Sequence, residues 1–381
     1  MQMQLCLTLK RCGQAMRVLA YPGVEVGESN NPYTRLLYGN MRASVDSFSY
    51  SRAIRQRYDI LHIHWPEWEL NVWRNPLIVL SRLRLKLVLI DVMRARGAKL
   101  VWTVHNLKAH DGLHPRIERW FWREFIKRLD GYIALTTGGR AAAQERFPAL
   151  QHIPGFVIPH GHYRGVYCSE GESSVRHELG LPPEARVILF FGQIRPYKNV
   201  PCLIGAFRQA NIPNTVLCIA GHAASPELRL HLQKCAETDS RVRLYMDAVP
   251  RATVHRYFGA ADLVVLPFRD ILNSGSALLA LSLNCPILVP RHGAMFELAA
   301  EIGPEWVRTY CGDLTSSELA AALAWAVGTQ RSSQAPLDRL NWSELSLQTE
   351  LAYEQIVGKH YAIAGTRSML RPPDEASPGS L

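Results

Sequence analysis

Two cations three residues apart, Arg195 and Lys198, follow an apolar run that ends at a glycine. The run covers residues 187–191, the glycine is Gly192, and a helix-like segment follows at 201–208. This order predicts a buried strand that delivers a basic turn to the edge of an α/β sheet, where ligands bind beyond the carboxyl ends of strands. Arg offers a planar fork of donors and Lys a compact point charge, so the turn suits a diphosphate. An ordinary strand, turn and helix with two solvated cations is the alternative.

A group of small residues further along the chain is a second candidate anion site. It consists of Asn273, Ser274, Gly275 and Ser276, and it precedes a helix-like segment at 277–283. Backbone amides at a helix N-terminus bind anions, and small side chains leave room for the approach. We therefore expect these residues to contact the same diphosphate as the basic turn. Arg269, four residues before the group, is a further candidate contact.

Three residues that follow predicted strands in the first half could take a proton from a substrate hydroxyl. They are Glu67, His105 and Asp111. A carboxylate is a suitable general base, and the unperturbed pKa of histidine lies near neutrality. The sequence does not choose among the three, and a role of Glu67 in capping the next helix is the structural alternative. His62 and His64 also have the spacing of a metal pair, but with no third ligand nearby we expect no metal site.

Aromatic and polar residues on the same loops are candidate ligand contacts. They are Asn31 and Tyr33 in an Asn-Pro-Tyr turn, His64 and Trp65 at the end of a strand, and His160, Gly161, His162 and Tyr163 where the first half ends. The Trp65 indole could stack on a ligand ring, and Gly161 permits a close backbone approach. A simple turn at Asn31 and a hinge at Gly161 are the alternatives.

Apolar, β-rich runs alternate with longer helical patterns along the chain, and these elements must position the residues above. Strands are predicted at 16–21, 60–64, 99–104, 131–135 and 156–159, and in a second series at 187–191, 215–220, 242–245, 263–266 and 286–289. Strands that alternate with helices form parallel sheets, so we expect an α/β fold with two Rossmann-like, doubly wound domains.

The predicted domains are separated by a polar stretch at 169–174. The first domain covers residues 1–168 and the second covers 169–345. A C-terminal helix at 346–364 could return to the first domain, and a disordered tail is expected at 365–381.

The composition describes a globular protein that is too long for one typical core. Its 381 residues are 48% hydrophobic and 20% charged, which fits two domains. The eight cysteines contain no CxxC pair and lie mostly in apolar segments, which is typical of reduced core cysteines. We therefore expect a cytoplasmic protein. Both Met1 and Met16 are candidate starts.

The formal net charge of +10 is concentrated in the first half of the chain. Cations alternate with apolar residues at 74–99, and tryptophans accompany Arg and Lys at 119–128. No run of about 18 apolar residues occurs, so we expect peripheral association with an anionic inner-membrane surface rather than a transmembrane helix. No nucleic-acid-binding module accompanies the charge, so nucleic acid is not an expected partner. Helices that pack only on their own sheet are the alternative.

Six ordered sequence blocks resemble the xanthan-type β-mannosyltransferases, the GumI-like enzymes of glycosyltransferase family 94. The matching stretches are 31–33, 58–67, 103–107, 160–163, 191–198, and 266–269 with 273–276. The resemblance covers nearly the whole folded length and implies the GT-B architecture, in which two Rossmann-like domains face a cleft. It implies an inverting glycosyltransferase of exopolysaccharide biosynthesis, which transfers mannose from GDP-mannose to a polyprenyl-diphosphate-linked oligosaccharide and forms a β-linkage. It also implies that no essential metal or other cofactor is bound.

One position departs from the related retaining GT-B families. Those families carry two glutamates that bracket the helix at 277–283, and the second glutamate holds the ribose. Here that position is Leu279 or Ala280, which argues against the retaining mechanism. The remaining candidates for the ribose contact are Arg269, Asp270 and Glu297.

Two other functions stay open at the level of the sequence. The donor sugar depends on the resemblance alone, so a GT-B glycosyltransferase that uses UDP-glucose or GDP-glucose is one alternative. A non-catalytic protein that binds anionic lipid or polysaccharide is the other. A dinucleotide-dependent oxidoreductase is excluded, because no GxGxxG motif follows a predicted strand with an acidic residue about twenty positions later.

Overall fold

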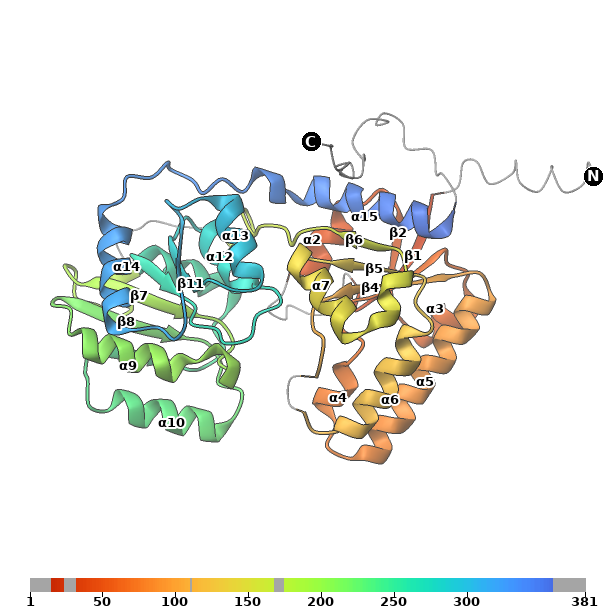
Figure 1. Cartoon of the computed structure of the whole chain (residues 1–381), viewed down its shortest axis with the longest axis horizontal. Coiled ribbons are helices and arrows are strands. Elements are labelled where there is room, and N and C mark those ends of the chain that lie inside the picture. Colours follow the sequence, from red (N-terminus) through yellow and green to blue (C-terminus); the bar gives the residue numbers. More distant parts are fainter. Residues whose placement is uncertain (1–14, 24–31, 110–111, 168–174, 359–381) are drawn as a thin grey trace, which may run out of the picture.

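Two parallel β-sheets of six strands each organise the chain. The structure is a computed structural model, and it describes residues 15–23, 32–109, 112–167 and 175–358. Figure 1 shows the two sheets side by side, each packed against its own helices. This arrangement confirms the α/β fold that the alternation of strands and helices predicts. The predicted domain boundary at residue 168 and the predicted disordered tail lie outside the described residues.

The first sheet has the strand order β2-β1-β3-β4-β5-β6. Its strands are β1 (Arg17–Tyr21), β2 (Ser44–Ser47), β3 (Ile60–Ile63), β4 (Lys99–Val104), β5 (Gly131–Ala134) and β6 (Gly155–Val157). All neighbouring strands are parallel, so their carboxyl ends lie at one edge of the sheet. The residues of β3 and β5 are buried throughout, as is typical of parallel strands that helices cover on both faces.

Within the described residues, six helices and one 3-10 turn connect these strands. They are α2 (Tyr33–Gly39), α3 (Tyr50–Arg55), α4 (Trp68–Val72), α5 (Pro76–Ala95), α6 (Pro115–Ile126), α7 (Thr137–Arg146) and η1 (Pro148–His152). Helix α5 begins with Pro76 after Asn75, whose side chain accepts a hydrogen bond from the amide of Leu77. Helix α6 buries Trp122 against Trp102 of β4, with ring centroids 5.2 Å apart. Aromatic packing therefore fixes α6 on the sheet.

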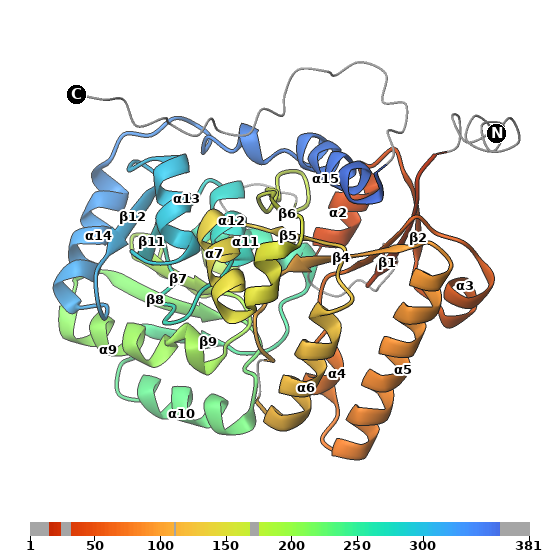
Figure 2. The same ribbon diagram turned by 45° about the vertical axis from the view of Figure 1, so that its right-hand side comes forward.

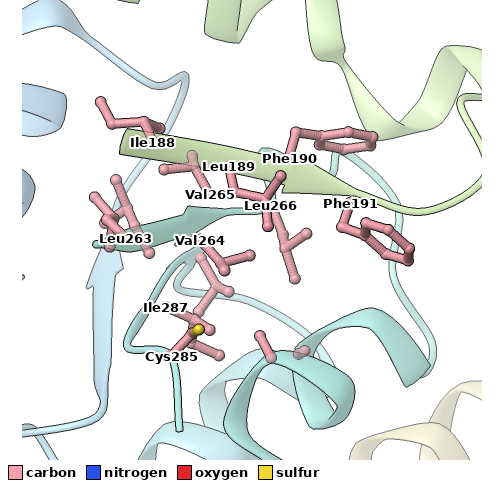
Figure 3. Packing of buried hydrophobic residues seen from close by; sticks show 14 of the residues in the cluster. Ile188, Leu189, Phe190, Phe191, Leu263, Val264, Val265, Leu266, Cys285 and Ile287 are labelled. Atoms are coloured by element: carbon pink, nitrogen blue, oxygen red, sulfur yellow. The ribbon is translucent and has the colours of Figure 1, made fainter. Parts of the chain in front are cut away.

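The second sheet has the strand order β12-β11-β10-β7-β8-β9. Its strands are β7 (Arg186–Phe191), β8 (Thr215–Ala220), β9 (Val242–Tyr245), β10 (Leu263–Val265), β11 (Ile287–Pro290) and β12 (Val307–Tyr310). The helices and 3-10 turns around it are α8 (Val175–Glu178), η2 (Pro196–Lys198), α9 (Val200–Ala210), α10 (Pro226–Ala236), η3 (Arg251–Thr253), α11 (Val254–Ala260), α12 (Gly275–Ser282), α13 (Ala294–Ile302) and α14 (Ser316–Gly328). Figure 3 shows apolar side chains of β7 and β10 packing together in its core, among them Leu189, Phe190 and Val264. This core holds the carboxyl end of β7 in place.

The sequence-based prediction lacks two of these strands, β2 and β12. Both are outer strands of their sheets. The residues of β2 are exposed or half-buried, and β12 is buried only at its two ends. An outer strand buries fewer side chains than a central one, so its sequence carries no continuous apolar run by which it could be recognised.

The chain passes between the two sheets twice, and the two crossings are bonded to each other. The first crossing follows β6, and the second leads through η4 (Asp338–Leu340) into α15 (Trp342–Val357). The amide of His162 donates to the carbonyl of Leu340 at 3.0 Å, and Nε1 of Trp342 donates to the carbonyl of His162 at 2.6 Å. A Cβ atom on Gly161 would lie 2.4 Å from the Trp342 indole, so glycine allows the crossings to touch.

Helix α15 packs on the first sheet although it follows the second sheet in the chain. Figure 1 shows α15 lying along the first sheet, next to α2. Its residues Leu345, Ala352 and Tyr353 join the core that contains Val18 of β1 and Ile60 of β3. The last described helix therefore completes the first domain.

Candidate active site

The carboxyl end of β7 delivers the basic turn that the sequence predicts. Gly192 follows β7 with a φ of 130°, which side chains other than glycine rarely adopt. A Cβ atom at this position would lie 2.7 Å from Oγ of Ser276 and 3.2 Å from Nζ of Lys198. The missing side chain thus lets an ammonium and a hydroxyl converge on the Gly192 backbone. Such a donor-rich, concave group is suited to a phosphate.

The Lys198 ammonium lies in an unusually buried position for a lysine. The residue is 8% exposed, and Nζ lies 5.1 Å from the centre of the Phe268 ring. Burial lowers the pKa of Lys198 to about 8, and the nearby Arg195 charge acts in the same direction. A bound anion would oppose both effects and favour the charged ammonium.

Arg195 and the first turn of α12 flank the same point. Nε of Arg195 donates to Oε1 of Gln193 at 3.2 Å, which holds the guanidinium beside the turn. Ser274 caps α12 by accepting a hydrogen bond from the amide of Ala277 at 3.1 Å. The N-terminus of α12, with Gly275 as its first residue, therefore carries the partial positive charge that favours an anion.

The carboxyl ends of β3 and β4 bring together a second group around His105. The His105 ring stacks on the Trp65 indole, with centroids 4.4 Å apart and an interplanar angle of 22°. Its Nε2 lies 3.2 Å from Nδ1 of His64, and Tyr33 meets it edge-on at 4.8 Å. Burial lowers the pKa of His105 well below the usual value of 6.5, and neighbouring histidines add to this effect. His105 is therefore a neutral imidazole at neutral pH, with a lone pair on one ring nitrogen.

Glu67 is more deeply buried than His105. It is 2% exposed, its Oε1 accepts a hydrogen bond from Nδ2 of Asn106 at 2.7 Å, and its Oε2 is buried without a partner among the described residues. Burial raises the pKa of Glu67 to about 7. Its side chain makes no capping bond to α4, so helix capping does not explain the residue.

His160 and Tyr163 connect the two groups. The Tyr163 hydroxyl lies 3.2 Å from Nε2 of His160, and the His160 ring packs on Tyr33 with centroids 4.8 Å apart. At the other end, a Cβ atom on Gly275 would lie 3.1 Å from the Tyr163 hydroxyl. Contacts therefore run without a break from His105, through Tyr33, to the start of α12.

Asn273 links the two domains through its side chain. Its Nδ2 donates to the carbonyls of Val104 and His105, at 3.3 and 3.2 Å. Its Oδ1 is buried and has no partner within the described ranges. The amide of Asn273 thus holds the end of β4 against the loop before α12.

Glu297 forms another polar link between the domains, in addition to Asn273 and the ion pair between Lys108 and Asp270 at 3.0 Å. Its carboxylate accepts hydrogen bonds from the amides of Thr137 and Gly138, at 2.8 and 2.6 Å, at the start of α7. Both oxygens of this candidate ribose contact are therefore engaged with the first domain. A cavity of about 200 Å³ adjoins the link and is lined from both domains, by Thr136 and His160 on one side and by Ser274 and Glu297 on the other.

Most of the predicted site residues within the described ranges gather in this region. Asn31 and Asp111 lie outside the described residues. Nδ1 of His162 accepts a hydrogen bond from the amide of Arg164 at 3.3 Å, within its own loop. Arg269 is exposed, and its amide donates to the carbonyl of Tyr197 at 2.8 Å. In the part of the chain that the structure describes, no three His, Cys, Asp or Glu side chains are grouped as metal ligands.

Three polar residues beneath His64 were not predicted from the sequence. Tyr38, Thr103 and Tyr353 all lie within hydrogen-bond distance of the buried His62 ring. Tyr353 is 291 positions away from His62 in the chain, and no local pattern connects the two. Thr103 lies within β4, two residues before His105, and this proximity is the one signal that the sequence offers.

Comparisons with known proteins agree with this geometry. The family model described as "Glycosyl transferases group 1" matches residues 185–327. The chain is 30% identical over 358 residues to a GDP-mannose:glycolipid 4-beta-D-mannosyltransferase from Xanthomonas campestris pv. campestris, covering 93% of this chain and 97% of the relative.

Solved structures of low sequence identity share the fold. HepE from Anabaena, in complex with UDP-glucose, has a TM-score of 0.59 at 15% identity, over 90% of this chain and 99% of that one. Sucrose-phosphate synthase from Thermosynechococcus elongatus has a TM-score of 0.57 at 19% identity, over 79% of this chain and 74% of that one. Both neighbours have the two-domain GT-B architecture expected from the sequence.

Proposed function

Because the chain belongs to the family of the GDP-mannose:glycolipid 4-β-D-mannosyltransferases, and is thus a GT-B glycosyltransferase, we propose that it transfers mannose from GDP-mannose to a glycolipid. The proposed acceptor is a polyprenyl-diphosphate-linked oligosaccharide of exopolysaccharide biosynthesis, and the proposed product has a β-linkage. The observation that carries the proposal is the unbroken run of contacts from His105 to the anion site at Gly192 and α12.

The proposed reaction inverts the anomeric carbon. The diphosphate would lie against Lys198, Arg195 and the first amides of α12. As the bond between C1 of mannose and the diphosphate oxygen breaks, negative charge collects on the departing GDP, and these donors stabilise it. The acceptor hydroxyl attacks C1 from the opposite face, and Nδ1 of His105 takes its proton.

A sugar-nucleotide screen tests the donor. We expect GDP-mannose at about 100 times its Kd to raise the Tm of the full chain by roughly 5 °C, because a ligand that binds only the native state stabilises it. UDP-glucose and GDP-glucose at the same concentration should raise it less. A larger rise with UDP-glucose would reject the donor, and stabilisation by GDP-mannose without transfer of labelled mannose to extracted glycolipid would favour the non-catalytic alternative.

An exposed apolar stripe on α5 supports association with a membrane, where a glycolipid acceptor resides. Leu77, Leu85, Val88 and Val92 recur on one side of the helix and are between 40% and 74% exposed. Figure 2 shows α5 and α6 extending side by side away from the first sheet. No helix within the described ranges is long and apolar enough to span a bilayer.

We call the exposed stripe of Leu77, Leu85, Val88 and Val92 the α5 face. Cations border this face. Arg82 and Arg84 are exposed on the same helix, and their guanidinium groups lie over the rings of Trp73 and Trp120. Apolar residues that enter the interface of a bilayer, flanked by arginines that meet anionic headgroups, are typical of peripheral membrane helices. We infer that the α5 face rests on an anionic membrane surface.

Replacing Leu85 with glutamine should weaken binding to vesicles that contain anionic phospholipid about tenfold, because a leucine side chain would no longer enter the bilayer. Leu230→Gln is the matched control. Leu230 lies on α10 of the second domain and is 52% exposed, against 50% for Leu85. Vesicle sedimentation measures both, and equal binding of the two variants would contradict the assignment of the α5 face.

A further inference from the structure

A chain of hydrogen bonds leads from His105 into the core of the first domain. Nε2 of His105 lies 3.2 Å from Nδ1 of His64. Nε2 of His64 in turn lies 2.6 Å from the hydroxyl of Tyr38, on α2. His64 has no measurable exposure and Tyr38 is 4% exposed, so water does not compete for these bonds.

The chain continues to a second buried histidine. Nδ1 of His62 lies 3.0 Å from the Tyr38 hydroxyl and 2.6 Å from the hydroxyl of Tyr353, on α15. Nε2 of His62 lies 2.7 Å from Oγ1 of Thr103 on β4. Burial lowers the pKa of His62 to about 3, so its ring is neutral and carries one N–H.

Two arrangements of protons satisfy this chain, and they differ at His105. In the first, Nε2–H of His105 donates to His64, Nε2–H of His64 donates to Tyr38, and the Nδ1 of His105 keeps its lone pair. In the second, every bond is reversed and Nδ1 of His105 carries the proton. A neutral His64 ring has one donor and one acceptor nitrogen, so its bonds to His105 and Tyr38 reverse together, and the Tyr38 hydroxyl then changes its own partner. The tautomer of His105 is thereby tied to groups deep in the core.

We propose that Tyr38, His62 and Tyr353 are positioning residues that hold His105 in the first arrangement, with the proton on Nε2 and the lone pair on Nδ1. This inference rests on the proposed role of His105 as the base, because only that tautomer can accept a proton at Nδ1. A base fixed in the wrong tautomer loses much of its catalytic effect even when its position is unchanged. The three residues thus act on the reaction without touching the substrate.

Helix α15 contributes Tyr353 to this hydrogen-bond chain from a distant part of the sequence. Tyr353 is contributed by the segment that crosses back from the second domain, and its side chain has no measurable exposure. The base on the first sheet is therefore oriented in part by a residue that follows the second sheet in the chain.

Histidine labelled with ¹⁵N in the full chain tests the inference without turnover. Long-range ¹H–¹⁵N correlation spectra distinguish the two tautomers, and the signals of His105 are those lost in His105→Gln. In the unsubstituted protein we expect Nε2 of His105 to carry the proton. In Tyr38→Phe the bond to His64 is lost, so we expect a mixture of tautomers and a kcat about tenfold lower, with the KM for GDP-mannose unchanged.

Tyr132→Phe is the matched control. Tyr132 is a fully buried tyrosine of the same domain whose hydroxyl accepts a hydrogen bond from Gln144 at 3.0 Å, apart from the histidine chain. Its removal should change neither the tautomer nor kcat. Tyr353→Phe cuts the chain at its other end and serves as a second variant if Tyr38→Phe does not fold.

The outcomes separate this inference from the proposed function. A proton on Nδ1 of His105 in the unsubstituted protein, or an unchanged tautomer in both tyrosine variants, would overturn the positioning role. If the expected tautomer is found in a protein that transfers no mannose, the positioning role stands and the proposed function fails.

Discussion

Replacing Lys198 with alanine should lower kcat about 100- to 1,000-fold and change the KM for GDP-mannose much less. Preorganised donors that meet charge developing in the transition state contribute effects of this size. Lys198 is 8% exposed, and its ammonium converges with Ser276 on the Gly192 backbone, where water competes little. Because the leaving diphosphate gains negative charge as the sugar departs, the ammonium acts more strongly on the transition state than on the bound donor.

Initial rates of mannose transfer from labelled GDP-mannose measure this effect. Lys234→Ala is the matched control, because Lys234 is an exposed lysine on α10 and should tolerate the change without loss of rate. A Lys198→Ala variant with more than a tenth of the normal kcat would remove Lys198 from the diphosphate site.

Replacing His105 with glutamine should lower kcat about 100- to 10,000-fold, which is the usual contribution of a general base. Glutamine retains the size and polarity of the side chain but cannot accept a proton at neutral pH. Glu67→Gln should reduce kcat only a few-fold, because Glu67 is 2% exposed and bonded to Asn106 rather than open to a substrate. Donor binding, followed by thermal stabilisation, should be intact in both variants.

The pH dependence of kcat/KM distinguishes His105 from Glu67 as the general base. Burial holds the pKa of His105 well below 6.5, so a reaction that depends on His105 should show no rising limb near pH 7. Loss of the Lys198 ammonium, whose pKa burial lowers to about 8, should reduce kcat/KM as pH rises through 8. Burial raises the pKa of Glu67 to about 7, so a reaction that depends on its carboxylate would accelerate as pH rises through 7. A rising limb centred near pH 7 that disappears in Glu67→Gln would assign the base to Glu67.

Much of the fold could be predicted from the sequence, because the central strands of both sheets are buried on both faces. Runs such as 187–191 and 215–220 are continuous and apolar for that reason. The outer strand β2 could not be recognised, since its Ser-Val-Asp-Ser sequence is half in solvent. Candidate site residues could be identified where they lie close to the end of a strand, because strand ends mark ligand sites in α/β sheets. His105 directly follows β4, and Lys198 lies in the turn after β7.

The rest of the site depends on contacts between distant segments. Tyr38 and Tyr353 reach His62 from two helices, and each looks like an ordinary core aromatic in its own helix. Asn273 also makes a contact that its sequence does not suggest. Its small polar group predicts an anion contact, whereas the folded chain directs its amide to the carbonyls at the end of β4.

The hydrogen bonds that join the two crossings at His162 and Trp342 limit how the two domains can move against each other. Because the two crossings are hydrogen-bonded to each other, the domains can rotate about this point. The same bonds restrict sliding or twisting of one domain against the other. The hydrogen bonds of Asn273 and Glu297 also join the two domains, so such a rotation has to break them. Opening of the molecule for substrate exchange therefore works against a few polar contacts, while both hydrophobic cores stay intact.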